Sequence, residues 1–111
     1  QGGFGVGVIP TLVDVGAGEN ITLKIEITST ENFDDKLYVN VTNEGVPDDF
    51  KANLSFNWTE KIILLPRRGV VDLAIDVSVP SGISGYKMFR VYARSLRYRA
   101  DGFGTGILNV T

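Results

Sequence analysis

The residues of this sequence with the clearest chemical use are its asparagines. Five of the seven begin an Asn-X-Ser/Thr triplet, the pattern that accepts N-linked sugars, whereas chance would give about one. The acceptors are Asn20, Asn40, Asn53, Asn57 and Asn109. Because a glycan can leave only from an exposed position, the triplets predict a glycoprotein with outward acceptors. The alternative is that these asparagines merely fill a hydrated sheet face.

A second candidate site is a basic, aromatic strip near the C-terminus. Arg90, Tyr92 and Arg94 alternate with apolar residues and are expected on one outer face of a strand. Arginine pairs with carboxylates, so this basic strip could bind acidic sugars or the carboxylates of a partner. The alternative is that it pairs with outward acids of a neighbouring strand, such as Asp72 and Asp76.

Catalysis and metal binding find little support in the residue types. The chain has no His and no Cys, which excludes disulfides, thiolate chemistry and triads that rely on imidazole. Two acidic loop clusters could bind Ca²⁺, but EF-hand spacing is absent and solvated loops are favoured. These clusters comprise Glu31, Asp34 and Asp35, and Asp48 and Asp49. We therefore expect no enzyme, no metal site and no cofactor.

Length, composition and charge limit which other classes of protein this chain could belong to. A length of 111 residues with 43% apolar and 22% charged content suits one globular domain. A net charge of −2 argues against nucleic acid as a partner. The longest apolar run, which lies within Lys61–Leu65, is too short to span a bilayer. Because the sequence begins at Gln1, we expect a processed chain or an excised part of a longer one.

Alternation of apolar and polar residues dominates the sequence and predicts β-strands. Proline and glycine punctuate the strand ends, and Trp58 could stack on a sugar or serve as half-buried packing. Seven or eight short strands at this spacing favour a sandwich or a barrel. The expected strands occupy residues 4–8, 20–28, 36–42, 51–57, 71–79, 89–94 and 107–110.

The N-terminal segment alternates bulky residues with glycine. Phe4, Val6 and Val8 are separated by glycines that let another backbone approach closely. This pattern suits a donor strand, residues 1–10, that completes the sheet of a neighbouring subunit while residues 11–111 form the sandwich. Phe4, Val6 and Val8 would then form the subunit interface. The alternative is an ordinary first strand, and the similar run at residues 102–106 could be a receiving or edge strand.

Two stretches carry a resemblance to a known family. The run Ile9–Thr11 followed by Val15–Asn20, and the run Val77–Gly82 followed by Gly85-Tyr86 and Val91–Ala93, resemble immunoglobulin-like modules of archaeal and bacterial surface proteins. The resemblance covers most of residues 4–95. It implies an all-β, immunoglobulin-like sandwich of seven to eight mostly antiparallel strands. It also implies a tyrosine corner at Tyr86, with a β-bulge near Lys87-Met88 to bring Tyr86 into phase with its strand.

Together these patterns predict an extracellular protein at the cell surface. The leading hypothesis is a structural subunit of a glycosylated, pilus-like archaeal filament, built from identical subunits by donor-strand complementation. The alternative is an immunoglobulin-like binding or spacer module of a larger surface or secreted protein. Expected partners are other copies of the chain and covalent N-glycans, with no nucleic acid and no membrane span in this chain.

Overall fold

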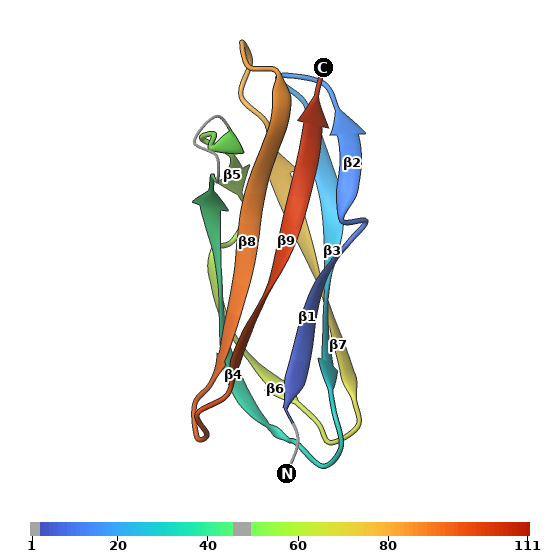
Figure 1. Ribbon diagram of the computed structural model, residues 1–111, viewed down its shortest axis with the longest axis vertical. Coiled ribbons are helices and arrows are strands. Elements are labelled where there is room, and N and C mark those ends of the chain that lie inside the picture. Colours follow the sequence, from blue (N-terminus) through green and yellow to red (C-terminus); the bar gives the residue numbers. More distant parts are fainter. Residues whose placement is uncertain (1–2, 46–49) are drawn as a thin grey trace.

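The protein is an all-β sandwich of two sheets packed face to face (Figure 1). The computed structural model describes residues 3–45 and 50–111, so the predicted acidic cluster of Asp48 and Asp49 lies outside the described residues. The first sheet has the strand order β1-β3-β7-β5, and the second has the order β2-β9-β8-β4-β6. The strands are β1 (Phe4–Ile9), β2 (Leu12–Val15), β3 (Asn20–Ser29), β4 (Asp35–Glu44), β5 (Ser55–Phe56), β6 (Glu60–Leu65), β7 (Val70–Ser78), β8 (Gly85–Ser95) and β9 (Asp101–Val110).

The core follows the alternation in the sequence. Leu23, Val39 and Ile75 are buried between the sheets, as their parity predicts. Phe89 of β8 is 0% exposed, and its ring centroid lies 5.4 Å from that of Phe56 on β5. The predicted immunoglobulin-like sandwich is therefore confirmed. Of the strand expected at residues 51–57, only Ser55–Phe56 forms a ladder.

The N-terminal strand pairs within its own chain. β1 runs antiparallel to β3 from Phe4 opposite Ser29 to Ile9 opposite Lys24. Phe4, Val6 and Val8 belong to this sandwich and pack against its core, with Val8 fully buried. The prediction that residues 1–10 leave their domain, with these three side chains at a subunit interface, is wrong for this fold. The physical reason is that β3 offers an open edge to β1 and the three apolar side chains fill their own core.

Glycines of β9, rather than those of β1, permit the close backbone approach. A Cβ built at Gly104 would lie 2.8 Å from the carbonyl oxygen of Val6, so β1 rests directly on β9. Gly5 and Gly7 face outward, and a Cβ on either meets nothing within 4 Å. The run at residues 102–106 is packed against β1 of its own chain, but its backbone ladder among the described residues is with β8, and β2 pairs with β9 only from Ile107 onward.

The outer position of Tyr86 contradicts two expectations. The β8–β9 register is continuous from Gly85 opposite Val110 to Arg94 opposite Asp101, so the expected β-bulge near Lys87-Met88 is absent from this ladder of the described chain. Tyr86 is 49% exposed and contacts the ring of Phe50 at 6.3 Å between centroids. It is not a buried tyrosine corner, because a continuous register keeps it on the outer face.

The first and last strands leave the sandwich at opposite ends of its long axis (Figure 1). The molecule extends 46 Å along that axis and 23 and 19 Å across it. Within residues 3–45 and 50–111, no helix is long and apolar enough to cross a membrane.

Candidate functional site on the outer faces of the sheets

Three of the predicted acceptors lie on the side of the first sheet. Asn20 begins β3 opposite Ser78 of β7, with its side chain directed away from the core. Asn57 follows β5, and its Oδ1 accepts a hydrogen bond from the backbone N–H of Asp76 at 2.9 Å. Asn53, in the segment before β5, is exposed as well.

The other two acceptors lie on the outer face of the second sheet. Asn40 of β4 stands directly between Tyr92 of β8 and Glu60 of β6. Asn109 of β9 donates a hydrogen bond from Nδ2 to Oδ1 of Asp14 at 3.1 Å. Both are half-buried by their neighbours. The structure thus places all five acceptors off the core, while their glycosylation stays a prediction.

The predicted strip becomes part of a wider surface, which we call the aromatic–arginine face. It consists of Arg90, Tyr92 and Arg94 of β8, Tyr38 of β4 and Phe103 of β9. The guanidinium of Arg90 lies 4.6 Å from the ring centroid of Phe103, and that of Arg94 lies 4.9 Å from that of Tyr38. The rings of Tyr92 and Phe103 are 5.8 Å apart. These contacts are cation–π and tilted aromatic pairs, which hold the strip flat on the sheet.

Acids of the same sheet partly balance the aromatic–arginine face. Arg90 Nη1 lies 3.9 Å from Oε1 of Glu44, while Arg90 Nε is buried without a hydrogen-bond partner among the described residues. The expected pairing with Asp72 and Asp76 is wrong, because both lie on β7 in the other sheet. There Asp76 accepts a hydrogen bond from Thr22 instead.

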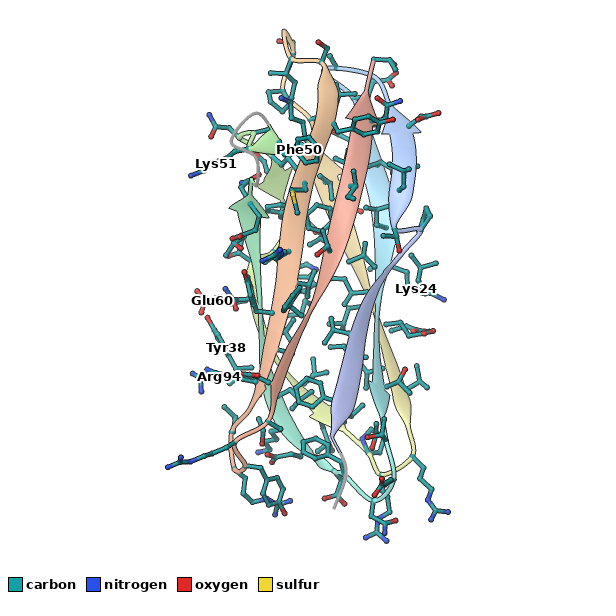
Figure 2. The ribbon with its side chains drawn as sticks, in the orientation of Figure 1. Lys24, Tyr38, Phe50, Lys51, Glu60 and Arg94 are labelled. Atoms are coloured by element: carbon teal, nitrogen blue, oxygen red, sulfur yellow. The ribbon has the colours of Figure 1, made fainter. Side chains whose placement is uncertain are left out.

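Tyr38 is held in place from the neighbouring strand. Its hydroxyl donates a hydrogen bond to Oε1 of Glu60 at 2.7 Å, and this bond raises the pKa of the phenol. Figure 2 shows Glu60, Tyr38 and Arg94 together on one side of the molecule, away from Lys24. The face therefore carries both charge signs.

A shallow hollow lies on the aromatic–arginine face. Its volume is about 630 Å³, and its lining includes Asn40, Glu44, Tyr92, Asp101 and Phe103. Cavities of several hundred Å³ are typical of ligand sites. One of the predicted glycan acceptors, Asn40, therefore stands in the wall of the hollow.

Two acids of the cluster at residues 31–35, Asp34 and Asp35, are engaged in protein contacts. Arg97 Nη2 lies 3.3 Å from Oδ1 of Asp34, and the backbone N–H of Arg97 donates to Oδ2 of Asp35 at 3.0 Å. Desolvation opposes ionisation of Asp35, but hydrogen bonds from Ser95, Lys36 and Arg97 outweigh it and lower the carboxyl pKa. Within the described residues, no group of three or more metal-ligating side chains could hold an ion.

Trp58 fits the packing alternative. Its Nε1–H donates to the carbonyl oxygen of Ala74 at 2.9 Å, and the ammonium of Lys61 lies 5.1 Å from its ring centroid. The indole is half-buried against the core cluster. It therefore fastens the β5–β6 segment to β7.

Comparisons with known proteins support the fold but show no family for this chain. No family model matches the chain, and no curated protein matches it. Among solved structures, the CARDB domain of the PF1109 protein from Pyrococcus furiosus has a TM-score of 0.60 at 14% identity, over 98% of this chain and 93% of that one. The PapD-like domain 7 of human CEP192 has a TM-score of 0.59 at 13% identity, over 96% and 83%.

A third similar structure is a complex between CaCohA2 and a variant of CaDoc0917. It has a TM-score of 0.60 at 12% identity, over 97% of this chain and 99% of that one. At such identities the likeness shows the fold alone. The chain is therefore an immunoglobulin-like β-sandwich domain.

Proposed function

We propose that the chain is a structural module of a glycosylated extracellular assembly at the cell surface. The observation that carries this proposal is the placement of all five acceptors off the core, on both broad sides of the sandwich. Sugars on these positions would surround the module without opening either sheet. Sugars placed in this way would leave the β6 edge of the second sheet and the ends of the molecule for protein contacts.

Mass spectrometry of the native protein tests the proposal. We expect hexose-rich additions on at least Asn40, Asn53 or Asn57, since each begins an acceptor triplet and stands off the core. Asn43 is an internal control, because it begins no triplet and its amide is bonded to the backbone of Leu54 through both polar atoms. Unmodified peptides at all five acceptors would remove the basis of the proposal.

More specifically, we propose that the module is the subunit of a pilus-like filament built from identical subunits. The exposed edge of the second sheet favours this proposal. β6 ends the strand order, and its outward Ile62 and Leu64 are 64% and 66% exposed. An edge strand with exposed apolar side chains is a template for pairing with another chain. We propose this edge as the contact between subunits, in place of the donated strand that the β1 register contradicts.

The alternative is a binding or spacer module of a larger surface protein. First and last strands that leave at opposite ends of a 46 Å axis suit modules joined in a string. One similar structure is a complex of two proteins, which supports a role in binding.

Electron microscopy and sedimentation of the protein distinguish the two forms. A filament subunit should give regular fibres, and Ile62→Lys should disperse them because it charges the pairing edge. Val70→Lys is the matched control, since Val70 is a similarly exposed apolar residue on the other sheet. A monomer at every concentration in all three proteins would favour the spacer or binding module.

A further inference from the structure

The lining of the hollow on the aromatic–arginine face includes one of the predicted glycan acceptors, Asn40. We infer that the first sugar linked to Asn40 occupies this hollow and rests on the rings of Tyr92 and Phe103, an inference that depends on the proposed glycosylation. The chemical class of ligand is thus a hexose or N-acetylhexosamine joined to Nδ2 of Asn40. The sugar would be a fixed part of the surface of the second sheet.

The strand register places the acceptor and the rings in one row. Asn40 of β4 is directly opposite Tyr92 of β8, and Tyr92 is directly opposite Phe103 of β9. Directly opposed residues have Cβ atoms about 4.5–5.5 Å apart, which is close to the width of one sugar ring. On the other side of Asn40 stands Glu60, bonded to Tyr38, so the open direction lies over Tyr92.

The chemistry of the hollow matches that of a sugar. A pyranose ring has a face of C–H groups, which aromatic rings cover well, and a rim of hydroxyls. The two rings are tilted by 49°, and Phe103 is 53% exposed although it lies mid-strand. Glu44, Arg94 and Asp101 line the same hollow and can exchange hydrogen bonds with hydroxyls.

Covalent attachment decides between this occupant and a free ligand. A tether gives the sugar an effective concentration on the order of millimolar, so weak stacking is enough to hold it. Of the two guanidinium groups of the strip, only that of Arg94 lines the hollow, because Arg90 is held by Glu44 and Phe103 outside its lining. A free acidic ligand would therefore meet one cation there beside the carboxylates of Glu44 and Asp101, a charge balance that disfavours it. A sugar on Asn40 would also block the hollow to other ligands.

A thermodynamic cycle tests the inference. The chain is secreted from a eukaryotic cell line that adds N-glycans, as wild type, Asn40→Gln, the Tyr92→Thr/Phe103→Thr double variant and the triple variant. We expect Asn40→Gln to lower Tm by about 4 °C with the rings present and to leave Tm unchanged without them. Asn20→Gln is the matched control, because Asn20 faces Ser78 rather than a ring and should lower Tm equally in both backgrounds.

The same cycle in protein from bacterial cytoplasm, which adds no N-glycan, isolates the sugar from the asparagine itself. The inference is supported if the effect of Asn40→Gln on Tm depends on the two rings in the glycosylated protein alone; this dependence is the coupling. In NMR spectra, ring-current shifts of the sugar protons should also disappear with the double variant. Coupling that is absent, or equal in both preparations, overturns it. Sugar on other acceptors but not on Asn40 also overturns it while leaving the proposed function intact. Five unmodified acceptors overturn both.

Discussion

Replacing Phe89 by Ala should lower the free energy of unfolding by about 3–5 kcal/mol. The ring is completely buried, packs on Phe56 and comes so close to Gly106 that a Cβ there would lie 2.5 Å from it. Removing it leaves a cavity between the two sheets, which rigid strands close only partly. Urea denaturation followed by circular dichroism measures the change.

Phe103→Ala is the matched control on the same sheet. Phe103 stands on the opposite face of that sheet and keeps half of its surface in water, so its removal should cost less than about 1 kcal/mol. Similar losses for Phe89 and Phe103 would contradict the inward and outward assignment of β8 and β9.

Gly104→Val should have the second largest effect, because it acts on the contact between β1 and β9. The new Cβ would meet the carbonyl oxygen of Val6 at 2.8 Å, and backbone cannot move aside as a flexible side chain does. Overpacking of this kind costs about 1–3 kcal/mol, and part of that cost should appear as release of β1 from β9. Hydrogen exchange of the β1 amides, together with the unfolding midpoint, measures both effects.

Gly5→Val provides the control within the contacting strand. Its Cβ meets nothing within 4 Å, and valine suits an extended strand, so stability should be unchanged or slightly raised. If Gly5→Val were as damaging as Gly104→Val, β1 would have to be packed with its glycines inward.

Alternation in the sequence predicts the parts of the fold that obey it. Strands β3, β4, β7 and β8 are all expected, because their apolar residues recur at every second position. β6 is recognisable only as an apolar run, because Ile62 through Leu65 are all apolar and alternation is invisible there. β2 has four residues, too few to show a period.

Errors arise where a local pattern has two tertiary outcomes. The alternating glycines of β1 suit a donated strand and a first strand equally, and only the open edge of β3 decides between them. Tyr86 is expected to turn inward through a bulge, but it lies on the outer face, where its ring contacts that of Phe50. Neither neighbour can be inferred from spacing along the chain.

Half of the candidate site is predictable from the sequence. The parity of β8 predicts Arg90, Tyr92 and Arg94 on one face, as the structure has them. The sequence does not predict that Tyr38 and Phe103 lie beside them, because the residues of one strand do not reveal which strands are its neighbours in the sheet. The outward parity of Tyr38 becomes a usable signal once β4 and β8 are known to be neighbours.

The parallel pairing of β2 with β9 has a mechanical consequence. The two strands are joined by bonds such as Ile107 N–H to the carbonyl of Thr11 and Thr111 N–H to that of Val15. Because the two chain ends lie at opposite ends of the long axis, tension on them would load the β1–β3 ladder first and then draw β2 and β9 past each other along their length. Every bond of the β2–β9 ladder then bears load at once, in shear, instead of opening one after another. A module with this strand pairing would resist extension most strongly along its long axis, which is the direction of pull if such modules are joined end to end.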